Sequence, residues 1–138
     1  MLEAWSTINW IAVVLGVLAY FALGALWFTP LFGRTWDRAI GHERVKGERF
    51  PPLYYVMPLV SSFLIAIATA WLMAAIGIDT VPEALLFALV VGLGYAAAIS
   101  FTNAVTPNTP RPLLYGAVTG GYHVVGIAVV AVIVAAFG

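Results

Sequence analysis

The sequence predicts an all-α integral membrane protein whose four transmembrane helices form an antiparallel up-down bundle. Hydrophobic residues make up 63% of the 138 residues and charged residues only 9%, whereas a typical soluble domain has about 25% charged residues. Four stretches contain no Asp, Glu, Lys or Arg, namely 4–33, 50–78, 84–110 and 112–138. Each is longer than the roughly 20 residues that a spanning helix needs. We therefore expect one membrane domain over residues 1–138.

Helix-ending signals divide these stretches into helices at roughly 8–29, 53–76, 82–103 and 113–137. Pro30 should stop the first helix, because proline removes a backbone donor and clashes with the preceding turn. Gly77 can take the left-handed position that ends the second helix, and Asp79 or Thr80 can cap the third. The resulting connections are short, except for the one at 31–52.

The orientation is predicted by the basic residues. Five of the six Lys and Arg residues lie in the connection 31–52, and the sixth is Arg111. The positive-inside rule then puts this connection in the cytoplasm and both termini outside. Acidic residues are interleaved with the basic ones, so a solvated loop is favoured over an anionic-lipid site. A short helical turn around Trp36 could lie in the headgroup region.

Small residues recur at every fourth position of the third helix, at Ala84, Ala88, Gly92, Ala96, Ser100 and Ala104. Such ridges let helix backbones approach closely in lipid. Gly116 and Gly120 repeat this spacing in the fourth helix, where a helix contact is favoured over room for a neighbouring aromatic ring. Four helices hardly enclose a pathway, and the ridge needs a close neighbour. We therefore expect a homo-oligomer, although the ridge could also be used within one chain.

His123 is an ionisable side chain near the middle of the fourth helix. Gly116, Thr119, Gly120 and His123 share one face of that helix. An ionisable group at such a depth normally faces a partner or a water-filled cavity. We therefore expect any functional site to lie on this face of the fourth helix.

The neighbouring helices should present Tyr20, Ser62 and Tyr95 at the depth of His123. A neutral imidazole hydrogen-bonded to one of them is favoured over a proton relay, a pore ligand or a metal ligand, because His123 has no acidic partner. Thr119 should bond to its own helix backbone. Asn103 should cap the third helix, and it completes the candidate polar site.

Catalysis is not expected from this sequence. An enzyme needs paired acids, a nucleophile with a base, or a metal cluster, and the membrane stretches contain no Asp, Glu, Lys or Arg. The chain has no cysteine, which removes disulfides, thiolate catalysis and Cys-based metal sites. Its net charge of zero does not indicate binding of nucleic acid. We expect no metal and no cofactor, and the lipid bilayer as the main partner.

Several stretches resemble a family of small bacterial membrane proteins catalogued as domain of unknown function 1761. They are Asn9-Trp10, Leu23 to Gly33 with Trp36, Thr102-Asn103, and Gly121-Tyr122-His123-Val124. Members of that family often have an acidic residue soon after the asparagine, where this chain has Val105-Thr-Pro-Asn. The resemblance implies a four-helix protein of the bacterial inner membrane and brings no established activity.

Two functions are compatible with these observations. The first is a homo-oligomeric pore or carrier subunit for a small solute or ion, which uses the small and polar face of the fourth helix. The alternative is a structural or accessory membrane protein, in which His123 and Thr119 only hold helices together. The two functions differ in whether water reaches that face of the fourth helix.

Overall fold

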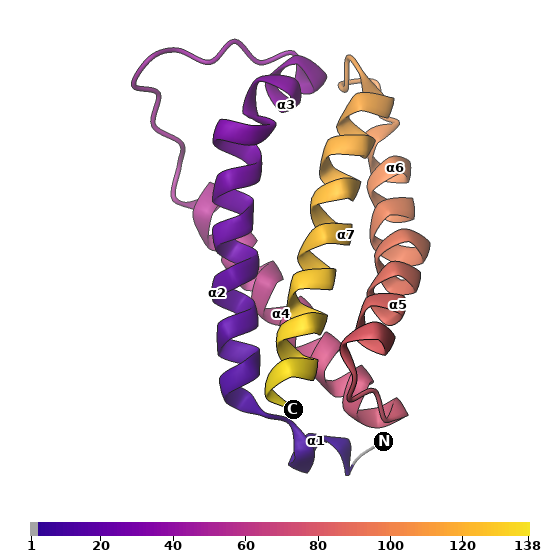
Figure 1. Ribbon diagram of the computed structural model, residues 1–138. Coiled ribbons are helices and arrows are strands. Elements are labelled where there is room, and N and C mark those ends of the chain that lie inside the picture. Colours follow the sequence, from indigo (N-terminus) through magenta and orange to yellow (C-terminus); the bar gives the residue numbers. More distant parts are fainter. Residues whose placement is uncertain (1–2) are drawn as a thin grey trace.

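The computed structural model describes residues 3–138, and all regular structure in that part of the chain is helical. Four segments are long and apolar enough to cross a membrane: Trp10–Leu31, Leu53–Ile76, Val81–Ala104 and Pro112–Phe137. They run alternately up and down, as Figure 1 shows. The predicted fold class is confirmed. We call the end that holds both termini the terminal end, and the opposite end the loop end.

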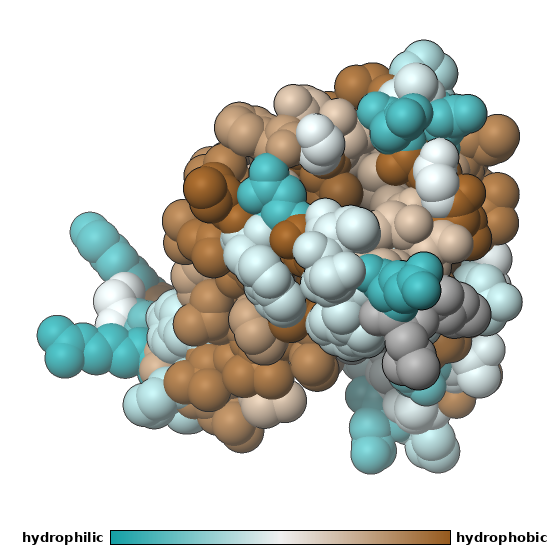
Figure 2. All heavy atoms as spheres, turned by 90° about the horizontal axis from the view of Figure 1, so that it is seen from below, coloured by the Kyte–Doolittle hydropathy of each residue, from teal (hydrophilic) through white to brown (hydrophobic). Residues whose placement is uncertain are grey.

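The outer flanks of the bundle are apolar, as lipid contact requires. Viewed from the terminal end, hydrophobic residues cover much of the surface, and the hydrophilic residues are scattered, several of them projecting at the edge of the view (Figure 2). Many large apolar side chains are exposed, among them Ile11, Leu18, Leu64 and Leu86. In water such exposure is unfavourable, but in a bilayer these side chains meet an apolar solvent.

Asn9 ties the start of the first span to the end of the last. It follows the four-residue helix α1 (Ala4–Thr7), and its side chain caps α2 (Trp10–Leu26) by accepting hydrogen bonds from two backbone N–H groups. Its Nδ2 donates to the carbonyl of Phe137 at 2.5 Å. One side chain therefore satisfies orphan backbone groups at the termini of two helices.

Pro30 does not end the first helix, so that prediction is wrong. The chain continues from α2 into a π-helical segment, η1 (Trp27–Leu31), which contains Pro30. A π turn bonds to the residue five back, and Phe32 N–H bonds in this way to the Trp27 carbonyl at 2.7 Å. The wider turn accommodates a proline that would clash with an α-helical turn.

A complete helix, α3 (Gly33–Ile40), follows where only a helical turn was expected. It lies at the loop end, above α2 (Figure 1). The extended connection is therefore shorter than the predicted 31–52 and begins after Ile40. It ends at α4 (Leu53–Ile76).

The helix α4 crosses α2 and α7 obliquely, as Figure 1 shows. Its second half packs into the bundle and buries Ala66, Thr69, Ala70 and Met73. Every residue from 53 to 60 is exposed. The half of α4 near the loop end is thus splayed away from the other helices.

The turn into the third span follows the predicted pattern of stop and start. Gly77 has φ of 75° and ends α4 in the left-handed region, which glycine adopts without steric cost. Thr80 is the cap: its hydroxyl accepts from the Glu83 backbone N–H at 3.4 Å and donates to the Glu83 carboxylate at 2.7 Å. The third span consists of α5 (Val81–Val91), a π-helical segment η2 (Gly92–Ala97) and α6 (Ala98–Ala104).

The fourth span, α7 (Pro112–Phe137), lies between α2 on one side and α5 to α6 on the other (Figure 1). Two apolar clusters flank it. The first joins α7 to α2 and α4 through Val13, Val17, Tyr20, Ala66, Ala70, Tyr122 and Val130. The second joins α7 to α4 and α5 through Met73, Ala84, Ala88, Ile127 and Ala131.

The small residues of the third span pack against α7 of the same chain. A Cβ atom added to Gly92 would lie 3.1 Å from Val124 Cα, and one added to Gly120 would lie 3.2 Å from Ala97 Cα. Both glycines are therefore helix contacts, as predicted. Gly116 faces the Phe101 ring, which a Cβ atom would approach to 2.4 Å. At Gly116 the alternative, room for an aromatic ring, is what the structure shows.

The π segment η2 keeps this ridge on one side of the span. A step of four residues drifts by about 40° per step around an α-helix. The wider π turn winds more slowly and offsets part of that drift. Burial shifts accordingly from Ala96, which is only partly buried, to Ala97, and resumes at Ser100 and Ala104.

Candidate functional site

His123 contacts Tyr20 of α2. Its Nδ1 and the Tyr20 hydroxyl share a hydrogen bond of 2.5 Å, and the Tyr20 side chain is only 1% exposed. With the hydroxyl donating, the ring proton of a neutral imidazole is on Nε2. Of the three predicted partners of His123, Tyr20 is therefore the one that binds it.

Two glycines make room for the aromatic groups around His123. A Cβ atom on Gly126 would lie 1.4 Å from Tyr20 Cε2, so the Tyr20 ring occupies the space that any larger side chain would need. Tyr122 stacks on Tyr20, with ring centroids 5.0 Å apart, and its hydroxyl lies over Gly24. Glycines on both α2 and α7 thus hold a tyrosine pair between the helices.

The segment η1 adds a further contact with α7. Trp27 Nε1 donates a hydrogen bond to the Val118 carbonyl at 3.0 Å, and its ring covers Gly121. The Phe28 ring meets Tyr122 edge-on, with centroids 5.1 Å apart. Two stretches far apart in the sequence, 23–33 and 121–124, therefore meet in space.

The other predicted partners of His123 lie elsewhere. Ser62 is fully buried, but its hydroxyl donates to the Pro58 carbonyl at 2.8 Å. Tyr95 is 67% exposed and faces away from the bundle. Neither residue bonds to His123: Ser62 lies next to Tyr122 of α7, and η2 turns Tyr95 outward.

Asn103 and Thr119 also differ from expectation. Asn103 is exposed within the last turn of α6 and, among residues 3–138, makes no side-chain hydrogen bond, so it is not the cap. The Thr119 hydroxyl is buried and has no hydrogen-bond partner in the described chain, although a bond to its own helix was expected. A buried polar atom without a partner is uncommon and calls for an explanation.

The predicted face of α7 is divided between two environments. Gly116 and Gly120 are buried against α6 and η2. Thr119 and His123 lie on the side toward α2, where Thr119 lines a cavity and His123 meets Tyr20. The small residues and the polar residues therefore do not line one common surface.

A cavity of about 360 Å³ lies between α2, α4 and α7 near the loop end. This volume falls within the roughly 300–1,000 Å³ of typical ligand sites. Aromatic rings supply most of its wall, together with small and polar side chains. The lining residues are Phe21, Gly24, Ala25, Phe28, Thr29, Trp36, Arg44, Phe50, Tyr54, Tyr55, Pro58, Tyr115, Thr119 and Tyr122.

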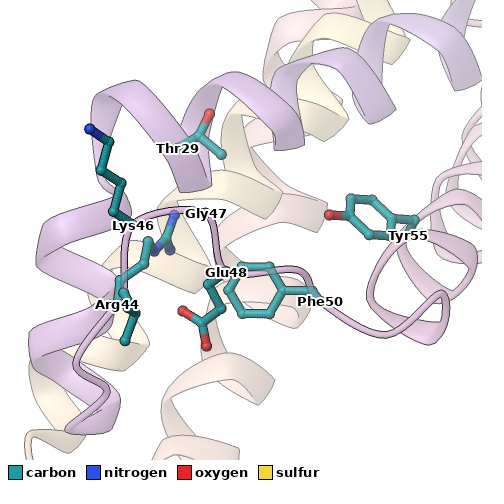
Figure 3. Close-up of a pocket in the computed structure, with 8 residues that line it drawn as sticks. Thr29, Arg44, Lys46, Gly47, Glu48, Phe50 and Tyr55 are labelled. Carbon is teal, nitrogen blue, oxygen red and sulfur yellow. The ribbon is translucent and has the colours of Figure 1, made fainter.

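A second, more polar hollow of about 540 Å³ adjoins this cavity under the connection after α3. Thr29, Arg44, Phe50 and Tyr55 line both. Figure 3 shows the Arg44 guanidinium and the Tyr55 hydroxyl directed toward the space between them, and the Lys46 amine directed away. The two hollows thus form one cleft with a polar outer part and an apolar inner part.

Arg44 holds the connection against α3. Its guanidinium donates to the carboxylate of Asp37 at 2.9 Å, and Asp37 is only 8% exposed. The guanidinium carbon also lies 5.6 Å from the centroid of the Phe50 ring, a cation–π distance. Glu48 directs its carboxylate to His42 at 3.0 Å and not to Arg44.

Sequence reasoning missed this cleft, although part of its pattern was visible. Phe21, Gly24, Ala25, Phe28 and Thr29 follow helical spacing on one face of α2 and η1. Small residues between aromatic ones on one face leave a hollow.

Residues 3–138 contain no group of three or more His, Cys, Asp or Glu side chains placed to hold a metal ion.

Comparison with known proteins gives a family but no activity. No curated protein and no solved structure matches this chain. A family model described as "Protein of unknown function (DUF1761)" matches residues 11–135. That range includes the η1 segment and the Gly-Tyr-His element, which the fold brings into contact. The chain is thus an integral membrane protein that belongs to the family of unknown function DUF1761.

Proposed function

We propose that this protein binds a small apolar or amphiphilic solute in the cavity between α2, α4 and α7, and exchanges it with the membrane at the loop end. It acts as a carrier-type binding protein and not as an enzyme. The observation that carries the proposal is the cavity itself, whose wall includes Thr119 and several other residues with polar groups, such as Tyr55 and Tyr115. A few polar groups in a largely aromatic hollow are typical of small-molecule sites.

The splayed half of α4 supports a route into this cavity from the bilayer. Residues 53–60 are all exposed, and Tyr54, Tyr55 and Pro58 also line the cavity. A solute that is dissolved in the apolar part of the membrane would meet this opening directly. Entry from the side requires no continuous pore.

The packing of α7 favours a carrier over a pore along its small-residue face. Gly116 and Gly120 are closed off by Phe101 and Ala97. His123 has a partner in Tyr20, which suits a role in holding α2 and α7 together. His123 therefore fits the alternative in which it only holds helices together. Thr119 and the cavity remain available for binding a solute.

Photolabelling in lipid nanodiscs tests the proposal, with a diazirine-bearing dodecanol as the probe. The modified peptides should come from the cavity walls on α2, α4 and α7, and unlabelled dodecanol should suppress them. Ala25 lines the cavity, so Ala25→Leu should fill part of it and lower labelling there.

Ala22→Leu is the matched control, because Ala22 is an exposed alanine on the same helix that does not line the cavity. It should leave the labelling pattern unchanged. Labelling spread evenly over all lipid-facing helix surfaces, and equal in the two variants, would contradict the proposal.

We also propose the inner membrane as the location, with the loop end in the cytoplasm. The distribution of Lys and Arg supports this orientation. Because the chain has no cysteine, single-cysteine variants need no background removal. In intact cells an impermeant thiol reagent should modify Asp79→Cys and not Val45→Cys, and the opposite pattern would reverse the orientation.

Association of copies is a further proposal. The small-residue ridge of the third span suggested association from the sequence, but it packs against α7 of the same chain and so no longer requires a second copy. The exposed half of α4 is the surface that remains for a second copy. Light scattering of the protein in mild detergent should give a mass above one chain if copies associate, and the mass of one chain would end this part of the proposal.

A further inference from the structure

The cleft has a cationic group at its outer end and an apolar inner end. Arg44 lines both hollows, and Figure 3 shows its guanidinium and the Tyr55 hydroxyl facing the same space. The cavity beyond is walled mostly by aromatic rings. We propose that the solute is a single-chain amphiphile with an anionic head, whose head binds Arg44 and whose alkyl chain occupies the cavity. This inference rests on the proposed function and specifies its ligand.

The guanidinium of Arg44 has donors to spare for such a head. An arginine side chain has five N–H donors in a planar fork that suits carboxylate and phosphate groups. One hydrogen bond goes to Asp37, at 2.9 Å. The Tyr55 hydroxyl points into the same space from the opposite side, as Figure 3 shows. Arg44 and Tyr55 are thus placed to hold an anionic head between them.

The other polar groups around the outer hollow leave donors of the Arg44 guanidinium free. Asp37 accepts one hydrogen bond from Arg44 at 2.9 Å, and the Glu48 carboxylate contacts His42 at 3.0 Å and not Arg44. Lys46 adds a further positive charge at the rim, although its amine is directed outward in Figure 3. The Thr29 hydroxyl is bonded to the Ala25 carbonyl. Arg44 is therefore the cation that lines both hollows, whereas Lys46 lines the outer one alone.

The position of the site suits a ligand that comes from a bilayer. An amphiphile in a membrane places its charged head at the headgroup level and its chain in the hydrocarbon. The cleft has the same arrangement, since Arg44 lies in the connection outside the spanning helices and Thr119 lies within α7. The exposed start of α4 leaves the side of the cavity open to lipid.

The test is competition against the diazirine dodecanol label in nanodiscs, at alkaline pH, where a carboxylate is ionised. The competitors are dodecanoate, dodecyl phosphate, dodecanol and dodecyltrimethylammonium, which share one chain and differ in the head. Either anion should displace the label at a lower concentration than dodecanol. The relative effect of the two anions tells a carboxylate head from a phosphate head.

Substitutions at the head site sharpen the result. Arg44→Gln should weaken competition by the anions by about tenfold or more, because a hydrogen bond to a charged group is lost, and should weaken competition by the neutral dodecanol much less. Arg38→Gln is the matched control, since Arg38 is an exposed arginine on α3 that lines neither hollow. Asp37→Asn should keep or strengthen anion competition, because Asp37 competes for the same guanidinium.

The outcomes separate this inference from the proposed function. If dodecanol and both anions compete equally, and Arg44→Gln changes nothing, the cavity binds an apolar solute and the anionic head is disproved. Stronger competition by dodecyltrimethylammonium would also disprove it. If no competitor suppresses cavity labelling, the proposed function fails as well.

Discussion

The two sides of α7 differ in how they use glycine. Toward η2 and α6, Gly120 brings the backbone of α7 close to Ala97, and Gly92 does the same opposite Val124. Toward α2, Gly126 and Gly24 instead make room for the rings of Tyr20 and Tyr122. The first side packs backbone on backbone at Gly92 and Gly120 and holds one ring, Phe101, over Gly116, whereas the second side separates its helices with aromatic rings at Gly24 and Gly126.

This difference explains where the cavity lies. Small residues on both helices close the gap between them and leave no room for a ligand. On the side toward α2, the rings of Phe28 and Tyr122 line the cavity, and residues 53–60 of the adjacent α4 are all exposed. The same α7 therefore has a structural side and a side with an accessible hollow, where Thr119 lacks a partner.

The largest effect is expected on the tightly packed side. Gly92→Leu should lower the free energy of unfolding by about 1–3 kcal/mol, because the new side chain meets the Val124 backbone and overpacks the contact. Gly94→Leu is the control, since a Cβ atom on Gly94 meets nothing within 4 Å. Thermal unfolding in nanodiscs measures both, and equal stability of the two variants would show that this side is not tightly packed.

An intermediate effect is expected at His123. His123→Leu should cost about 1 kcal/mol, because it removes the bond to Tyr20 and leaves that buried hydroxyl without its partner. His123→Gln keeps both a donor and an acceptor and should retain much of the stability. If both variants unfold like the original protein, the Tyr20–His123 bond does not hold the helices together.

The smallest effect, with the opposite sign, is expected at Thr119. Thr119→Val replaces an unpartnered buried hydroxyl with a methyl group of similar size, so stability should be unchanged or rise by up to about 1 kcal/mol. Unfolding of this variant in the absence of added solute gives the value. A loss of more than about 1 kcal/mol would mean that the hydroxyl has a structural partner.

The architecture was largely predictable from the sequence, because it depends on hydropathy and on local signals. The uncharged stretches predicted four spans, and Gly77 and Thr80 behave as their types suggest. Pro30 was misread, because a π turn depends on neighbouring packing and has no simple sequence signal. The ends of a helix depend mainly on nearby residues in the sequence, whereas the backbone geometry at a proline also depends on packing against other helices.

The site was less predictable, because it depends on how the helices cross. Placing all helix ends level put Ser62 near the depth of His123, where it lies next to Tyr122, but the same reasoning placed Tyr95 in the interior, and η2 turns it outward. Tyr20 was predicted correctly as a partner of His123, because α2 and α7 lie side by side. The position of Arg44 in the cleft depends on the path of a connection, which no periodic pattern predicts.

The most direct test of the difference between the two sides of α7 is the reactivity of two single-cysteine variants in nanodiscs. Thr119→Cys places a thiol in the cavity wall, and Ser100→Cys places one on the packed side, where Ser100 is 7% exposed. A small water-soluble thiol reagent should modify the first and not the second, because reaction needs access and an ionised thiol. Dodecanoate should slow the first reaction. If both thiols are equally inert, the side of α7 toward α2 is as closed as the other, which contradicts a binding cavity there.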